Sequence, residues 1–355
     1  MKPWMKRMTS ALAISMMTCA LFTGCLGGSE APGSSSGSDA GKKVEEPIKM
    51  EAMATLKLGE KDIPVYEFKG EEPLPLEMSM MTVTPEAIYL IEHTHGKDDK
   101  VLGKYPYKGD QLTAREDLGE ATSTVLTTDG KNVYFFLKGG HLGIYDGQEL
   151  TKVPLSDNRE GSTQVVYGSD QAYFSRSGAL KTAGYTRAKI GKDGYTDPVL
   201  LLSQKEYVHK MKDERDEVSP KLIFADEMGF YLRWTARHGS KNGQGWTSPI
   251  YLYDKDGKEV RQLNPDAGVP DGTEKWAGKK LLVCTTKDYF CFLTTGAIRV
   301  FDKNTSAYVG DIKWAIDKRP VLADLGHFAV DGDNHIYFGI WDDKDKQQHI
   351  YRMDL

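Results

Sequence analysis

The feature that most constrains the fold of this 355-residue chain is a segment that recurs about every 50 residues. Each copy begins with a polar turn and runs directly into a short strand of apolar and aromatic residues. The clearest copies are TTDGKNVYFF, ending at Phe136, and AVDGDNHIYFGI, ending at Ile340. One aromatic residue per copy serves as a marker: Tyr89, Tyr134, Tyr173, Tyr231, Tyr289 and Tyr337. This period is typical of propellers and solenoids, in which each repeat is one supersecondary unit.

Each copy except the last lies within a group of four short strand-like runs separated by tight polar turns, which is the pattern of a four-stranded antiparallel blade. The sequence therefore predicts an all-β fold, a six-bladed propeller over residues 47–355. The last copy has only three such runs before the chain ends. We expect the N-terminal strand 63–68 to complete the last blade, because this would close the ring and cover an exposed edge.

Some boundaries and connections are also predicted. In the first repeat we expect a last strand near 113–118, and in the second repeat a separate first strand at 123–127. We expect the third strand of the third repeat at 179–185. The fourth repeat carries an insertion at 238–247, and the polar stretch 203–217 favours a surface helix or an ordered loop.

The start of the chain indicates a cellular address. Lys2, Lys6 and Arg7 precede an apolar stretch, 8–22, that is too short to be interpreted first as a membrane-spanning helix, so we expect a secretory signal. The sequence from Leu21 to Cys25 resembles the lipobox of bacterial lipoproteins, with Phe22 where Leu is usual. The resemblance implies a signal peptide over 1–24 and a lipid on Cys25.

The residues after Cys25 are rich in Gly and Ser, and they predict a flexible tether over 25–46. A lipid anchor with such a tether places the folded domain at the membrane in the cell envelope, in an extracytoplasmic position. The net charge is −5, with Lys interspersed among Asp and Glu, which argues against a nucleic-acid partner.

From residue 61 onwards the chain resembles a six-bladed propeller of the TolB-like or NHL-like kind, and the segments DGDNHIYF and DGKNVYFF carry the resemblance most closely. It lacks the GH and WD pairs of WD40 blades, the double glycine of kelch repeats and the YWTD of receptor propellers. The resemblance therefore implies the architecture of such a bacterial lipoprotein and no particular activity.

Connections between second and third strands lie on the same face of a propeller as the connections between blades, where propellers usually bind their partners. We expect the binding face to include residues from these connections: His93, His95, His141, Arg176, Arg237, His238, Trp246, Trp341 and Asp342.

No sequence motif supplies a catalytic residue, a cofactor or a metal site. The loop histidines have no metal-ligand spacing, and the Asp-Gly turns are explained by the positive φ that hairpins require. The sequence therefore favours a non-enzymatic binding module for a protein, peptide or glycan. The alternative is an extracytoplasmic carbohydrate-active hydrolase or lyase that uses loop carboxylates and histidines as acid and base.

Two cysteines belong to the predicted folded domain. If Lys287 and Asp288 form a two-residue hairpin turn, Cys284 lies opposite Cys291. Such cross-strand neighbours form either a disulfide, which an oxidising compartment permits, or a pair of small buried thiols.

Overall fold

The computed structural model describes residues 50–355 except 76, 94–98, 156–159, 177–182, 204–205, 207–217, 241–242, 248, 277–280, 295, 314, 317–318, 321–327 and 343. The chain divides into two compact units, Met1–Glu46 and Pro47–Leu355, and the described residues belong to the second. The signal peptide, the lipidation of Cys25 and the tether are predictions outside the described residues, as is nearly all of the stretch 203–217. Among the described residues no helix is both long and apolar enough to cross a membrane.

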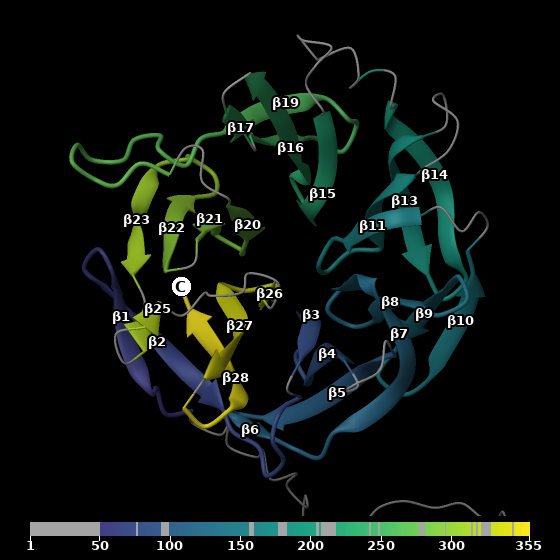
Figure 1. Cartoon of the computed structure of the whole chain (residues 1–355). Coiled ribbons are helices and arrows are strands. Elements are labelled where there is room, and N and C mark those ends of the chain that lie inside the picture. Colours follow the sequence, from purple (N-terminus) through teal and green to yellow (C-terminus); the bar gives the residue numbers. More distant parts are fainter. Residues whose placement is uncertain are drawn as a thin grey trace, which may run out of the picture. The chain divides into compact units, whose positions relative to one another are not determined.

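The described elements are β-strands in antiparallel sheets (Figure 1). The first large sheet contains β3 (Met78–Val83), β4 (Ala87–His93), β5 (Lys100–Lys108), β6 (Gln111–Leu112), β7 (Glu116–Thr128), β8 (Val133–Leu137), β9 (His141–Tyr145) and β10 (Leu150–Pro154). The next sheet contains β11 (Glu160–Val165), β12 (Gln171–Arg176), β13 (Gly184–Gly191) and β14 (Gly194–Ser203).

The following sheet contains β15 (Val218–Asp226), β16 (Gly229–Ser240), β17 (Gly243–Thr247), β18 (Ile250–Tyr253) and β19 (Glu259–Leu263). After it come β20 (Leu282–Thr285), β21 (Tyr289–Leu293), β22 (Ala297–Asp302) and β23 (Tyr308–Lys313), and then the small pair β24 (Ala315–Ile316) and β25 (Arg319–Pro320). The last sheet joins β26 (Phe328–Val330), β27 (His335–Asp342) and β28 (Gln347–Asp354) to β1 (Ala54–Leu58) and β2 (Lys61–Phe68).

The sheets stand around a common centre, with β3, β11, β15, β20 and β26 innermost (Figure 1). This is the architecture of a β-propeller. Around this centre β7 contacts both β3 and β11, β15 contacts both β11 and β20, and β26 contacts β3. The apolar core therefore lies between neighbouring blades, where the face of one sheet packs on the next.

The marker tyrosines explain why the repeat has its sequence. All of them lie on the second strand of a blade, and five are at most 3% exposed, Tyr289 being half-buried. In three blades the hydroxyl of the marker donates to an aspartate at the end of the first strand or in the turn that follows it. These pairs are Tyr134 with Asp129 at 2.7 Å, Tyr231 with Asp226 at 3.0 Å and Tyr337 with Asp331 at 3.2 Å. The turn residue thus satisfies the one polar atom that each aromatic carries into the core.

The strand predicted to complete the last blade is β2. It pairs antiparallel with β28, and Val65 lies opposite Met353. Both residues are fully buried. The strand β1 then pairs with β2 and contacts β23 of the preceding sheet. A chain segment from the N-terminal side therefore covers the edge that β28 would otherwise expose.

Several predicted boundaries are wrong. The last strand of the first blade and the first strand of the second are one element, β7, which pairs first with β5 and then with β8 across an irregularity between Ala121 and Leu126. The third strand of the third blade is β13, later than 179–185. The insertion of the fourth blade is a hairpin, in which Arg237 of β16 pairs with Trp246 of β17. Residues 119–124 of β7 (GEATST) contain no large apolar residue, which is why the sequence predicted two strands there.

The predicted register of the cysteine hairpin is confirmed, since Cys284 lies opposite Cys291. Both are free thiols and fully buried. The pKa of the Cys291 thiol is raised, mainly by a hydrogen bond with Cys284 and to a smaller extent by burial. Of the two alternatives, the structure has the pair of small buried thiols rather than the disulfide.

Candidate functional site

The residues predicted for the binding face lie where second and third strands connect. His93 ends β4, His141 begins β9 and Arg176 ends β12, and these three are half-buried. Trp341 and Asp342 end β27, and Trp341 is 38% exposed. Arg237 and His238 lie in β16 and Trp246 in β17, whereas His95 lies outside the described residues.

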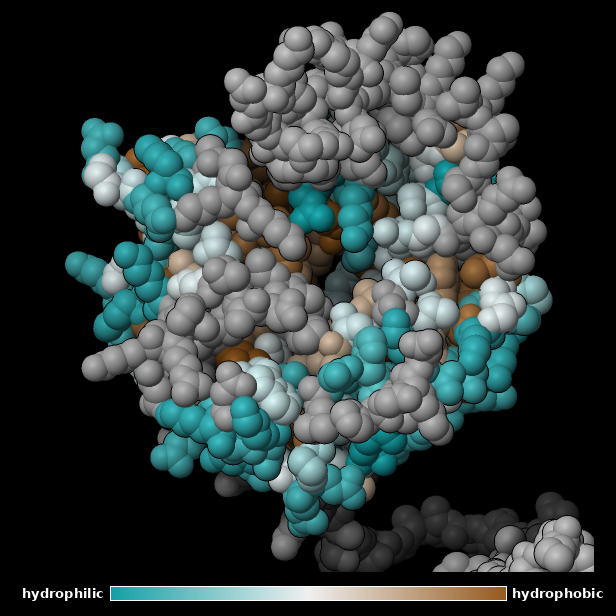
Figure 2. Space-filling model, viewed as in Figure 1, coloured by the Kyte–Doolittle hydropathy of each residue, from teal (hydrophilic) through white to brown (hydrophobic). Residues whose placement is uncertain are grey.

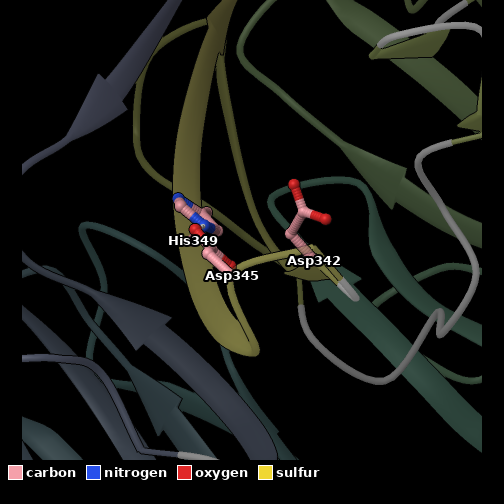
Figure 3. Close-up of side chains that lie close together, drawn as sticks. All are labelled: Asp342, Asp345 and His349. Atoms are coloured by element: carbon pink, nitrogen blue, oxygen red, sulfur yellow. Dashed lines mark hydrogen bonds and ion pairs between the residues drawn. The ribbon is translucent and has the colours of Figure 1, made fainter.

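Among the described residues of this face, several side chains that could bind a metal ion gather in one place. Among the described residues, the single group of three or more metal-capable side chains is Asp342, Asp345 and His349, whose ligand atoms lie within 4.8 Å of one another. It contains one predicted residue, Asp342, and none of the predicted histidines. Figure 3 shows Asp345 close to the His349 ring and Asp342 beside them at the end of the neighbouring strand.

The turn between β27 and β28 fixes the two aspartates. The N–H of Lys346 donates to the carbonyl of Asp342 at 2.9 Å, and Lys346 has a φ of 60°. One carboxylate oxygen of each aspartate accepts a backbone N–H, that of Lys344 for Asp342 (2.8 Å) and that of Gln347 for Asp345 (3.0 Å). The backbone of the turn therefore orients both carboxylates.

His349 lies between two carboxylates. Its Nδ1 is 2.7 Å from Oε1 of Glu67 on β2, and its Nε2 is 2.9 Å from Oδ2 of Asp345. A neutral imidazole has one N–H, so two such hydrogen bonds require the imidazolium. Burial disfavours the charged ring, but the hydrogen bonds to Glu67 and Asp345 outweigh it and raise the pKa of His349. This ring therefore joins the N-terminal strand, β28 and the β27–β28 turn.

A cavity of about 200 Å³ lies among the innermost strands. Figure 2 shows a hollow in the middle of the molecule with hydrophobic residues on part of its wall. The lining is uncharged and comes from β3, β7, β11, β15 and β26, with Tyr167 just after β11. Its hydrogen-bonding groups are Thr82, Thr127, Thr128, Gln164 and the Tyr167 hydroxyl.

Tyr167 lies at the end of this cavity where first strands turn into second strands. A Cβ on Gly130 of the β7–β8 turn would lie 2.6 Å from the Tyr167 ring, and one on Gly332 of the β26–β27 turn 2.5 Å from it. The ring thus fills the space between turns of two other blades. Burial raises the pKa of Tyr167 to about 12.

Hydrogen bonds between neighbouring blades also gather at these turns. The N–H of Gly168 donates to the carbonyl of Asp129 at 2.8 Å. The Asn334 side chain accepts from the N–H of Asp288 at 2.9 Å and donates to its carboxylate at 2.6 Å. The turn face is therefore occupied by contacts within the protein.

Sequence reasoning missed His349 and Glu67. His349 lies inside a strand and was interpreted only as part of it, and Glu67 precedes it by 282 residues. The one local signal was the spacing of Asp342, Asp345 and His349, which places an aspartate three residues and a histidine seven residues after Asp342.

No protein-family model matches the sequence, and no curated protein matches it either. The solved structures that resemble the chain include Kuenenia stuttgartiensis hydrazine synthase, with a TM-score of 0.44, 10% identity and coverage of 77% of this chain and 83% of that one. The β-propeller domain of the Trilobed protease from Pyrococcus furiosus, described as having an open velcro topology, has a TM-score of 0.38 and 13% identity, with coverage of 75% and 79%. A prolyl endopeptidase has a TM-score of 0.38 and 11% identity over 78% of this chain and 39% of its own.

Proposed function

We propose that this protein is a lipid-anchored, extracytoplasmic binding module. It is a six-bladed propeller of the TolB-like or NHL-like kind, with its last blade completed by the N-terminal strand. Cys25 carries the lipid, the segment 25–46 is the tether, and the loop face binds a protein, peptide or glycan. The binding role rests on the architecture and on the absence of a recognisable catalytic motif in the sequence.

The observation that carries this proposal is the difference between the two ends of the blades. The turns between first and second strands are linked across blades, and Tyr167 fills the space between Gly130 and Gly332. The second-to-third connections include the exposed ion pair of Lys138 with Asp99 at 3.0 Å, and they also present an exposed aromatic, Trp341, next to Asp342 in the sequence. Exposed aromatics with polar neighbours are typical anchors of binding sites.

A binding experiment with defined probes tests the role of the loop face. The full chain is immobilised and exposed to purified glycans and peptides, and each ligand that binds is measured again on variants. We expect Trp341→Ala to weaken binding about 30-fold or more, since aromatic anchors that become buried on binding contribute about 2 kcal/mol or more by truncation. The matched control is Val260→Ala, which removes a 52% exposed apolar residue from β19.

Unchanged binding in Trp341→Ala and in His141→Ala together would contradict the loop-face assignment. The anchor is tested separately by metabolic labelling with a fatty-acid analogue. We expect labelling of the wild type and none of Cys25→Ser, and labelled Cys25→Ser would rule out this residue as the attachment site.

The hydrolase or lyase alternative has one supporting observation, the position of His349 between Asp345 and Glu67. An acid or base must hold or release a proton at the operating pH. Turnover of a polysaccharide that Asp342→Asn abolishes would favour this alternative over the binding role.

A further inference from the structure

We propose that Asp342, Asp345 and His349 form a binding site for a zinc ion, with Glu67 as the residue that positions the histidine. This inference concerns a metal and is independent of the partner proposed above. It starts from the atoms around Nε2 of His349. A carboxylate oxygen of Asp345 is 2.9 Å from it, and a ligand atom of Asp342 is within 4.8 Å of both.

The three side chains bring one imidazole nitrogen and two carboxylate groups into the same small volume, since their ligand atoms all lie within 4.8 Å of one another. Zinc accepts these ligand types, and an imidazole nitrogen binds it through the lone pair. Asp342 ends β27, Asp345 lies in the turn and His349 belongs to β28, so one hairpin supplies all three.

Glu67 prepares the ring for a metal. Its carboxylate is 2.7 Å from Nδ1 and accepts the N–H there, so Nε2 is the nitrogen that faces the metal position. A carboxylate on the far nitrogen is the usual outer partner of a metal-bound histidine, where it fixes the tautomer and the orientation of the ring. Glu67 belongs to β2, on a strand that pairs with β28, so its position is set by the sheet.

The same turn indicates which metal ion fits. One imidazole nitrogen and two carboxylate oxygens suit zinc, which takes nitrogen and oxygen ligands in tetrahedral sites, whereas calcium takes only oxygen ligands and more of them. Lys344 and Lys346 in the turn offset part of the negative charge. A hard cation held mainly by charge is therefore disfavoured. Three protein ligands leave a fourth position for water or for a donor atom of a bound molecule.

The site combines two exposed or half-exposed aspartates with a partly buried histidine. The exposed fractions of the side chains are 22% for His349 and 44% for Asp345. A metal ion can therefore enter from solvent, and its ligands come from the end of β27, the turn and β28. Binding would tie these elements together at the end of the last blade.

Zinc alone is the probe. The full chain is treated with a chelator, dialysed and titrated with zinc chloride in a calorimeter. We expect one zinc ion to bind per chain. X-ray absorption of the complex should show nitrogen and oxygen ligands at about 2.0–2.2 Å.

The variants separate this site from adventitious binding. His349→Gln and Asp342→Asn should each abolish tight binding, and Glu67→Gln should weaken it about 10–100-fold without removing a ligand. His335→Gln is the matched control, because His335 also pairs with an aspartate, at 2.7 Å from Asp331, but belongs to no group of three metal-capable side chains among the described residues. It should bind zinc like the wild type.

If His349→Gln fails to fold, Asp342→Asn decides the question, since it removes a proposed ligand and leaves the side chains of Glu67, His349 and Asp345 in place. The proposal is overturned if no saturable binding occurs up to about 1 mM zinc. It is equally overturned if Asp342→Asn and a folded His349→Gln bind zinc as the wild type does, because the metal would then be held elsewhere.

Discussion

At the scale of single residues, close contacts between residues from different blades restrict which side chains fit in the interior of this propeller. Tyr167 is the clearest case, because its ring occupies the space in which Gly130 and Gly332 would otherwise carry a Cβ. At Gly332 the contact with the Tyr167 ring is what requires glycine, whereas at Gly130 the backbone φ of 93° also favours glycine. A glycine can thus be required by a side chain from another repeat.

We expect Gly332→Ala to lower the free energy of unfolding by about 1–3 kcal/mol, because the added methyl group would overlap the Tyr167 ring. The cost should largely disappear in a Tyr167→Ala background, since the space is then free. Urea unfolding of the two single variants and the double variant measures the coupling. Additive effects of the two substitutions would mean that Gly332 is required for another reason.

His335 gives a prediction about pH. Its Nδ1 is 2.7 Å from Asp331 and its Nε2 is 3.7 Å from Asp354, while Arg352 opposes the positive charge. The hydrogen bond with Asp331 raises the pKa of His335 above its usual 6.5 despite burial. Because the folded pKa is the higher one, the stabilisation is fully present below pH 6.5 and is lost as the pH rises through the folded value.

We therefore expect the stability difference between the wild type and His335→Gln to be largest at acidic pH and to vanish at alkaline pH. Urea unfolding across this range measures the difference, and an NMR titration of the ring gives the folded pKa directly. A difference that grows with increasing pH would show that the sign is wrong.

At the scale of elements, the last sheet depends on a strand from the other end of the sequence. Ile63 and Val65 of β2 are fully buried in a cluster with residues of β21, β22, β27 and β28. The strand therefore contributes apolar burial as well as backbone pairing with β28. Its loss would expose a sheet edge and part of the core at the same time.

We expect Ile63→Ala to lower the free energy of unfolding by about 2–5 kcal/mol, the usual range for truncating a fully buried isoleucine. Val260→Ala, on an outer strand, should change it by less than about 0.5 kcal/mol. Urea unfolding measures both variants. Similar small effects for the two would show that β2 contributes little to the stability of the fold.

At the scale of the whole molecule, the buried thiols report how the blades stay together. Cys284 and Cys291 lie in the same cluster as Ile63 and Val65, between two sheets. They have no exposed surface, so a thiol reagent reaches them only when this region opens. Their reaction rate therefore measures the free energy of opening the packed cluster between their own sheet and the sheet that contains β2 and β28.

We expect the peptide containing Cys284 and Cys291 to label slowly in the folded wild type and at least about tenfold faster in Ile63→Ala, because 1.4 kcal/mol of lost opening free energy corresponds to tenfold. Mass spectrometry of this peptide separates it from Cys19 and Cys25. Equal labelling rates would mean that the thiols are exposed by a motion that does not involve β2.

The sequence by itself determined the local part of this protein. Turn residues followed by alternating aromatics predicted the strands, the marker tyrosines of their core face and the register of Cys284 with Cys291, because these depend on residues a few positions apart. Along β7 and the β16–β17 hairpin, where apolar and polar residues do not alternate regularly, the same reasoning placed the strand boundaries wrongly. The tertiary structure alone decided which distant side chains meet. It placed Glu67 against His349 and Tyr167 against Gly332, because the pairing of β2 with β28 and the packing of blades around one centre bring together residues that no local pattern relates.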